Sequence, residues 1–311
     1  MEKKTLTDCY QRITPYVHRT PVLSSCLINE IVGAKLFFKC ENFQRMGAFK
    51  MRGATNAIMQ LPEEQQKRGV VTHSSGNFAQ AVSLAAKSLG VKASIVMPNN
   101  APTVKKKAVL GYGGIITECE PTVAARQKTA DNIVSETGAA FIHPSNDLDV
   151  ILGNSTSAME LLEEHNALDY IVTPIGGGGL IAGTALAAHF FGDNCEVIGG
   201  EPFAADDAYR SMISGQIETN ETTNTVADGL RTQLGDINFP IIKKHVNRII
   251  RVKEEAILEA MQLVYERLKI VIEPSSAVAL AAVIHEKKAF QNKAVGIIVS
   301  GGNVDLSQLP F

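Results

Sequence analysis

Short apolar runs alternate along this chain with longer stretches in which apolar positions recur every three or four residues. Short runs rich in Val, Ile and Phe predict β-strands, and the longer amphipathic stretches predict helices. The predicted strands occupy residues 34–40, 69–73, 92–98, 114–119, 140–144, 170–175, 196–200, 248–252 and 294–299. Alternation of strand and helix is typical of parallel sheets with helices on their faces, so we expect an α/β fold.

The helical stretches between these strands have recognisable features. The predicted helices cover residues 1–19, 51–58, 77–89, 103–110, 122–137, 155–165, 180–191 and 254–269. Gly90 follows the third of them, at a position where glycine commonly ends a helix. In the last one, the apolar side chains fall on one face, at Ile257, Met261, Val264 and Leu268.

Composition narrows the class of protein. The chain has 311 residues, of which 45% are hydrophobic and 20% charged, as in an ordinary globular protein. Its net charge of −2 gives no electrostatic reason to expect a nucleic-acid partner or binding to an acidic membrane. No apolar run approaches transmembrane length, and no apolar segment follows Met1. The five cysteines are scattered without metal-ligand spacing, so we expect reduced thiols in a cytoplasmic protein.

Three blocks of the sequence carry candidate chemistry. Lys50 follows Phe49 at the end of block 41–50, just ahead of a predicted helix. Two small-residue turns, 74–77 (Ser-Ser-Gly-Asn) and 176–179 (four glycines), each follow a predicted strand and precede a predicted helix. This arrangement aims backbone N–H groups at an anion. One lysine and two anion sites together suggest a phosphorylated aldehyde held as a Schiff base.

Each block also has a simpler interpretation. Lys50 alone would be a surface lysine at a helix start, and Ser75 alone an N-cap. Four consecutive glycines cost backbone entropy and have no packing rationale, so close approach to a ligand explains them better. A dinucleotide site is the competing hypothesis for 176–179, but G-x-G-x-x-G spacing is missing, and only Glu201 stands near a suitable acidic position.

A fourth block, 300–305 (Ser-Gly-Gly-Asn-Val-Asp), completes a pattern. In this order, the four blocks resemble the fold-type II pyridoxal 5′-phosphate (PLP) enzymes, specifically the serine racemase and serine/threonine dehydratase family. The resemblance runs from about residue 20 to the C-terminus. It implies a tryptophan synthase β-like α/β fold of two domains, each with a mainly parallel open sheet flanked by helices.

The resemblance also implies an organisation for the chain. Residues 1–64 and 148–311 would form a large PLP-binding domain, and residues 65–147 a small domain. A homodimer is expected on the same ground. Because the sequence ends soon after block 300–305, we expect no C-terminal regulatory domain of the kind found in biosynthetic threonine deaminases.

By resemblance, Lys50 would hold the cofactor and later act as a base beside the substrate α-carbon. Phe49 and Asn77 would lie near the cofactor ring, and Gly176, Gly177, Gly178 and Gly179 would wrap its phosphate. Ser300 would hydrogen-bond the pyridine nitrogen and leave it mostly unprotonated, which favours elimination and racemisation. A turn serine is the alternative for Ser300. Two further matches, Asp228 and Glu273, would lie near the substrate and the ring.

The turn 74–77 would hold the substrate carboxylate through Ser74, Ser75, Gly76 and Asn77. Ser75 matches the serine that, in serine racemases, exchanges the α-proton on the face opposite the lysine. Lys50 and Ser75 would then be the two catalytic residues of a two-base racemisation. Helix capping without catalysis is the alternative for Ser75.

Block 201–207 matches the family's divalent cation site. Glu201 and Asp207 would supply carboxylate oxygens and Ala205 its carbonyl, a set that suits Mg²⁺, Mn²⁺ or Ca²⁺. A solvated acidic loop is the alternative. The chain departs from the family pattern at Phe78, at 145–147 and at 153–156, and the last two segments are expected near the substrate side chain.

The sequence therefore predicts a PLP-dependent enzyme acting on a small β-hydroxy amino acid. We expect it to convert serine to D-serine, to pyruvate and ammonia, or to both. Threonine and threo-3-hydroxyaspartate are alternative substrates, and for the latter a basic residue such as Arg126 would have to reach the distal carboxylate. A β-replacement enzyme of the same fold and a non-catalytic phosphate-binding protein are less favoured alternatives.

Overall fold

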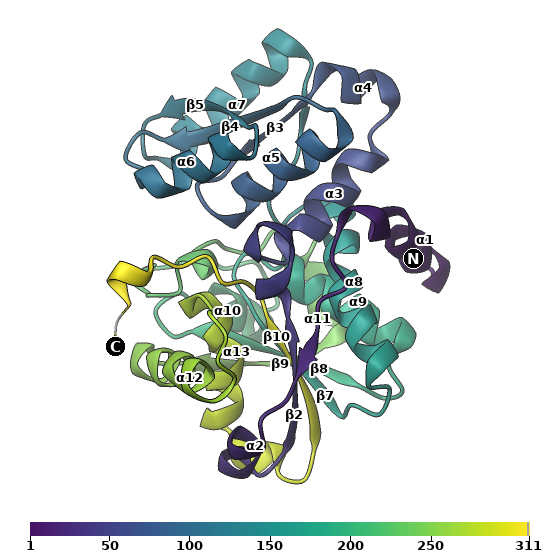
Figure 1. The fold of residues 1–311 in the computed structure, drawn as a ribbon, viewed down its shortest axis with the longest axis vertical. Coiled ribbons are helices and arrows are strands. Elements are labelled where there is room, and N and C mark those ends of the chain that lie inside the picture. Colours follow the sequence, from purple (N-terminus) through teal and green to yellow (C-terminus); the bar gives the residue numbers. More distant parts are fainter. Residues whose placement is uncertain (310) are drawn as a thin grey trace.

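The computed structural model of the chain describes residues 1–309 and 311. Two sheets, one in each of two lobes, form its frame (Figure 1). The larger sheet has the strand order β1-β2-β10-β7-β8-β9, and the smaller one has the order β5-β4-β3-β6. The strands are β1 (Val22–Leu23), β2 (Lys35–Cys40), β3 (Val70–His73), β4 (Ala93–Pro98), β5 (Ile115–Cys119), β6 (Ala140–Phe141), β7 (Tyr170–Pro174), β8 (Glu196–Pro202), β9 (Val246–Val252) and β10 (Ala294–Val299).

Both sheets are mainly parallel. Among the strands that the structure describes, only the two-residue β1 runs antiparallel, against β2. The central strand β10 pairs with β2 on one side and β7 on the other, so the first and last predicted strands of the chain lie side by side. This arrangement confirms the predicted α/β fold with two mainly parallel sheets flanked by helices.

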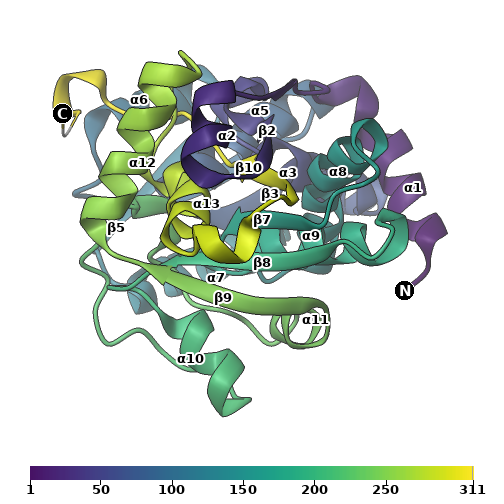
Figure 2. The same cartoon turned by 90° about the horizontal axis from the view of Figure 1, so that it is seen from below.

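Helices cover both faces of the six-stranded sheet. On one face, α2 (Cys26–Val32), α12 (Glu254–Arg267) and α13 (Pro274–His285) share one apolar core with the strands (Figure 2). On the other face, α1 (Lys3–Ile13), α8 (Leu148–Glu164), α9 (Gly179–Phe191) and α11 (Phe239–His245) share a second core. Two more helices begin at predicted site residues. Helix α3 (Lys50–Gln60) begins at Lys50, and α10 (Asp207–Ser214) begins at Asp207.

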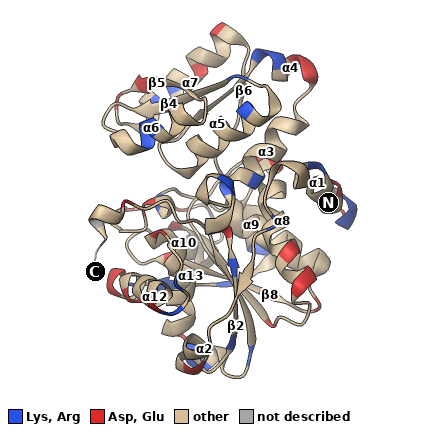
Figure 3. Cartoon of the chain, in the orientation of Figure 1, with Lys and Arg blue, Asp and Glu red and all other residues tan. Residues whose placement is uncertain are grey.

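We call residues 63–141 the small lobe, and the part built on the six-stranded sheet the large lobe. The small lobe contains β3 to β6 with α4 (Glu63–Arg68), α5 (Asn77–Leu89), α6 (Thr103–Gly111) and α7 (Val123–Thr137). Helix α5 has the predicted bounds, and Gly90 ends it in the left-handed conformation with a φ of 69°. Acidic and basic residues are interspersed along the ribbon of both lobes (Figure 3).

Several predicted boundaries were wrong for identifiable reasons. Helix α8 begins at Leu148, seven residues before the predicted start at 155, because the Asp147 carboxylate caps the N–H groups of Asp149 and Val150. The strand expected at 140–144 stops at Phe141, ahead of Pro144. Helix α13 was missed because it is buried on nearly all sides and therefore lacks a polar stripe. The short helices α2, α4, α10 and α11 were also missed.

The predicted domain boundaries can be placed on these elements. The boundary at 64/65 falls inside α4, and the boundary at 147/148 falls at the first residue of α8. The division into domains stays a prediction.

Among the residues that the structure describes, no helix combines the length and apolar character that a membrane crossing requires.

Close helix contacts fix the start of α3. A Cβ on Gly53 would lie 2.8 Å from the Val150 carbonyl oxygen in α8, and one on Gly183 in α9 would lie 2.6 Å from that of Ile151. Gly153 of α8 packs against the Arg52 backbone. Glycine at these positions therefore lets α3, α8 and α9 approach closely. Segment 153–156 is buried in this helix contact, and its expected position near the substrate side chain stays a prediction.

Candidate active site

Lys50 is the first residue of α3. Its amine lies beside Pro144, in the segment that leads from the small lobe to α8. Its Nζ donates a hydrogen bond of 2.8 Å to the Pro144 carbonyl. The same atom lies 4.9 Å from the ring centre of Phe49 and 5.5 Å from that of Phe78. Burial of the ammonium group lowers the pKa of Lys50 to about 8, against the opposing effect of the Glu273 carboxylate. Lys50 can therefore exchange a proton near neutral pH.

Block 300–305 holds the segment that precedes Lys50. The Phe49 N–H donates to the Ser300 carbonyl at 3.0 Å, and the Gly302 N–H donates to the Gly47 carbonyl at 2.9 Å. The Ser300 hydroxyl is buried at the end of β10, 3.0 Å from the Ser276 hydroxyl. The first and last of the sequence blocks are thus brought together by backbone hydrogen bonds.

The glycine loop, residues 176–179, connects β7 to α9. A Cβ on Gly176 would lie 2.7 Å from Leu230 Cα, and one on Gly179 would lie 2.9 Å from Ser145 Cα. Gly178 has a φ of 80°, which disfavours any other residue. The loop therefore fits only as glycine, and it leads into a helix of 13 residues whose N-terminus suits a phosphate group.

Asn77, the first residue of α5, connects the turn 74–77 to the large lobe. Its Nδ2 donates to both Glu273 carboxylate oxygens at 2.9 Å, and its Oδ1 accepts from Asn303 at 2.9 Å. Burial raises the pKa of Glu273 to about 7, although the Asn77 hydrogen bonds act in the opposite direction. Two residues far apart in sequence, one in each lobe, therefore meet at this position.

The remainder of the turn 74–77 is less enclosed. The Ser74 hydroxyl accepts a long hydrogen bond of 3.4 Å from the Gly76 N–H. Ser75 is half-buried, and a Cβ on Gly76 would meet nothing within 4 Å. The turn thus leaves room at the N-terminus of α5, and the role of Ser75 stays a prediction.

These contacts assemble most of the predicted residues into one site at the carboxyl ends of the strands, the usual ligand position in α/β sheets. Pro144 contacts Lys50, and the next residue, Ser145, packs against Gly177 and Gly179 of the glycine loop. Because Phe49 contacts Ser300, the lysine, the glycine loop and the end of β10 are neighbours.

His143 is a site residue that the sequence did not single out. Its Nδ1 lies 3.2 and 2.8 Å from the N–H groups of Ser145 and Asn146, so this nitrogen accepts and carries no proton. Burial, with nearby His73 and Lys50, lowers the pKa of His143 to about 4. A histidine directly after a predicted strand was the available signal.

The predicted cation ligands lie close together but are already hydrogen-bonded. Glu201 accepts from the N–H groups of Ala208 and Tyr209 at 3.0 and 2.8 Å. Asp207 accepts from the Asn220 amide at 2.7 Å and the Leu234 N–H at 2.9 Å. Burial raises the pKa of Asp207 to about 6, and burial with the Asp207 charge raises that of Glu201.

The donor chemistry at this position fits a cation, because two buried carboxylates repel one another there. Ala205, the third predicted ligand, is also buried. Among residues 1–309 and 311, however, no group of three His, Cys, Asp or Glu side chains has metal-binding geometry. The cation stays a proposal.

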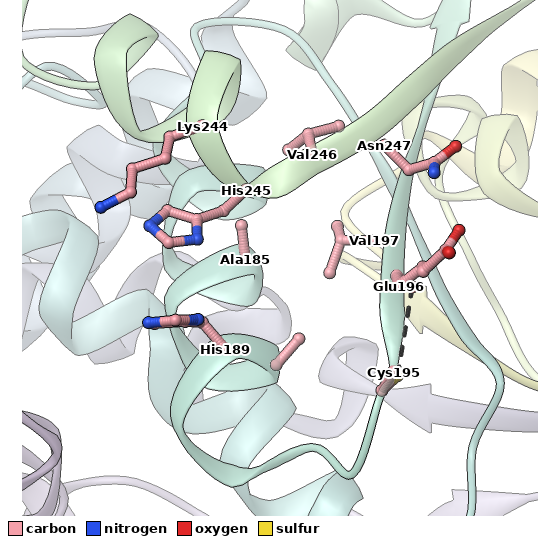
Figure 4. A pocket seen from close by; sticks show the side chains of 10 residues that line it. Ala185, His189, Cys195, Glu196, Val197, Lys244, His245, Val246 and Asn247 are labelled. Carbon is pink, nitrogen blue, oxygen red and sulfur yellow. Dashed lines mark hydrogen bonds between the residues drawn. The ribbon is translucent and has the colours of Figure 1, made fainter.

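A separate hollow of about 290 Å³ lies at the opposite, amino-terminal end of β8 (Figure 4). The rings of His189 and His245 lie there with their centres 4.4 Å apart and their planes tilted by 44°, and Cys195 directly precedes the strand. It shares none of the residues of the candidate active site.

An α/β protein with an enclosed lysine of lowered pKa, a glycine loop at a helix N-terminus and a buried serine beyond the last strand has the parts of a PLP-dependent enzyme. The family described as "Pyridoxal-phosphate dependent enzyme" matches residues 13–301, so the chain belongs to this family.

Comparison with known proteins narrows this class. The chain is 48% identical to a serine racemase of Dictyostelium discoideum, covering 98% of this chain and 96% of that protein. It is 49% identical to a beta-hydroxyaspartate dehydratase of Paracoccus denitrificans, covering 97% and 96%. The solved structure of maize serine racemase matches with a TM-score of 0.96 at 47% identity, covering 99% of this chain and 95% of that one. These likenesses confirm the predicted family, its fold type II and its dependence on PLP.

Proposed function

We propose that this enzyme racemises serine, dehydrates it to pyruvate and ammonia, or does both. The observation that carries the proposal is the position of the Lys50 amine, enclosed by two aromatic rings and connected through Pro144 and Ser145 to the glycine loop. The similarity to a Dictyostelium serine racemase over nearly the whole chain supports it.

Several residues would hold the cofactor. Gly176, Gly177, Gly178 and Gly179 would receive the phosphate, Phe49 and Asn77 would border the ring, and Ser300 would bond the ring nitrogen. When bound, PLP supplies an electron sink for negative charge developing at the substrate α-carbon.

Two residues would move protons. Lys50, with a pKa near 8, would take the α-proton from one face of the substrate. Ser75 would exchange a proton on the opposite face, which gives the other enantiomer. The turn formed by Ser74, Ser75, Gly76 and Asn77 would orient the substrate carboxylate at the N-terminus of α5. Loss of the β-hydroxyl instead would lead to the keto acid.

Further parts of the proposal rest on the family resemblance. Glu201, Ala205 and Asp207 would hold Mg²⁺, or Mn²⁺ or Ca²⁺, as a structural ion. Two chains would form a homodimer in the cytoplasm, with residues 65–147 as a small domain on a large domain of residues 1–64 and 148–311.

A second candidate substrate is threo-3-hydroxyaspartate. The 49% identity to a beta-hydroxyaspartate dehydratase is as high as that to serine racemases. Arg126 also lies near His73, the residue before Ser74: burial is the main cause that lowers the pKa of His73, and the Arg126 charge lowers it further. It could therefore attract a distal carboxylate.

Two parallel incubations separate these possibilities. PLP-loaded enzyme is given L-serine or threo-3-hydroxyaspartate with Mg²⁺, and D-serine, pyruvate and oxaloacetate are quantified together. D-serine or pyruvate supports the first proposal, and rapid oxaloacetate formation with little reaction of serine supports the second. A protein that turns over neither substrate would refute both.

A further inference from the structure

Asn238 lies at the start of α11, buried between two segments of the candidate site. It is the residue before the first helical position, where asparagine often caps the helix with its side chain. Here the side chain makes no such cap, and it is fully buried. Its carboxamide is therefore used for something other than α11.

The carboxamide bonds to the glycine loop and to the segment that leaves the small lobe. Its Nδ2 donates to the Gly177 carbonyl at 2.8 Å and to the Ser145 carbonyl at 3.2 Å. Its Oδ1 accepts from the Gly235 N–H at 3.1 Å. Both donor hydrogens and one acceptor position are thus occupied, a complete arrangement for a buried amide.

The bond to Gly177 fixes the direction of the next N–H group. A trans peptide is planar, and its carbonyl and N–H point to opposite sides. Because Asn238 holds the Gly177 carbonyl on one side, the Gly178 N–H must point to the other. Within the part of the chain that the structure describes, no protein acceptor receives the N–H of Gly178 or Gly179.

The turn that carries Asn238 is itself held by the neighbouring segment. The Asn146 Oδ1 accepts from the Ile237 N–H at 2.9 Å, and its Nδ2 donates to Asp236 at 2.8 Å. Residues 145–146 and 235–238 therefore secure each other beside the glycine loop.

We propose that Asn238 is a positioning residue for the cofactor phosphate, acting through the Gly177 carbonyl to aim the Gly178 N–H group at that phosphate. This inference rests on the proposed assignment of the glycine loop to the phosphate. It predicts that loss of the Asn238 donors weakens binding of PLP but hardly changes binding of pyridoxal, which lacks the phosphate.

The test compares the dissociation constants of PLP and pyridoxal, measured by absorbance of the bound ligand, in wild type, Asn238→Asp and Asn238→Ala. Asn238→Asp keeps the shape and the acceptor for Gly235 but replaces both donors with a carboxylate, whereas Asn238→Ala removes the donors without adding a charge. We expect the preference for PLP over pyridoxal to fall roughly tenfold, the effect of losing one or two hydrogen bonds to a buried loop. The ³¹P resonance of bound PLP should also shift.

Controls separate the possible failures. Asn247→Asp changes an exposed asparagine on β9 and should leave the preference unchanged. Equal binding of PLP and pyridoxal by wild type would refute the phosphate assignment of the loop itself. A wild-type preference that both Asn238 variants retain, or an equal loss of both ligands, would overturn the role of Asn238.

A folding defect does not block the test. Thermal unfolding of the cofactor-free variants shows whether they fold, and Asn146→Ala provides a milder disturbance of the same turn. We expect Asn146→Ala to lower the preference for PLP by a smaller factor, and an unchanged preference and ³¹P resonance in this variant would count against the proposal.

Discussion

The two helix-terminal turns of the site differ in how the protein holds them. At the glycine loop, side chains are excluded by the backbones of Leu230 and Ser145. At the turn 74–77, a Cβ on Gly76 would meet nothing, and Ser75 is half-buried. The loop in the large lobe is thus shaped by packing before any ligand binds, whereas the turn in the small lobe is open. This difference fits a cofactor that stays bound and a substrate that enters and leaves.

The largest effect should come from the open turn. Ser75→Ala removes the proposed proton carrier on one face, so D-serine formation should fall by roughly 10²–10⁴-fold. Binding of PLP should stay unchanged, because Ser75 does not contribute to the glycine loop. Chiral chromatography of the products measures the first quantity, and absorbance titration the second. Equal loss of racemisation and PLP binding would show that the two turns are not independent.

A pH experiment examines the bond between the open turn and the large lobe. The pKa of Glu273 is raised from 4.5 to about 7 in the folded protein. The folded chain therefore binds this proton more tightly than the unfolded chain, and protonated Glu273 contributes to the stability of the cofactor-free protein at low pH. That contribution is lost as pH rises from about 4.5 to 7, and amounts to about 3 kcal/mol. Urea unfolding of Glu273→Gln should lack this dependence. The exposed Glu255→Gln is the control, and an unchanged pH profile in Glu273→Gln would contradict the assignment.

Paired glycine substitutions compare the two turns directly. Gly179→Ala forces a methyl group against the Ser145 backbone, and overpacking of about 1–3 kcal/mol should weaken PLP binding by roughly 10- to 100-fold. Gly76→Ala meets open space and should leave PLP binding within about twofold. Titration with PLP measures both variants. If Gly76→Ala proves as damaging as Gly179→Ala, the contrast between the turns is wrong.

The smallest effect should come from a contact across the lobes. Lys105 in α6 bonds Asp228 in the large lobe at 2.7 Å, and both side chains are partly exposed. Exposed pairs contribute about 0.2–1 kcal/mol, so Lys105→Met should change the KM for serine by less than about fivefold. The affinity for PLP should not change. Lys107→Met, on the same helix, serves as a control in steady-state kinetics.

The sequence predicted the sheets and the main site blocks because both depend on local patterns. Strand 294–299 and helix 77–89 have their predicted bounds. The glycine loop and Lys50 were singled out by residue type and position, and their roles stay predictions. Asn238, His143 and the Glu273–Asn77 bond were not assigned in this way, since their roles depend on contacts between distant segments. Helix α13 was not predicted because it is buried on nearly all sides, and it therefore lacks the alternation of apolar and polar positions that marks an amphipathic helix.

The buried end of α3 places a constraint on how this sequence can change. Arg52 bonds both Glu41 and Glu160, and Lys39 also bonds Glu160, with all four side chains at most 1% exposed. Two positive and two negative charges thus cancel inside the protein, two residues from Lys50. Replacing one partner by a neutral residue leaves a buried charge without its counter-charge, which lowers the free energy of unfolding by about 3–5 kcal/mol. Natural variants should therefore exchange these four positions as a set, and a library that randomises them singly should return almost only the parental residues.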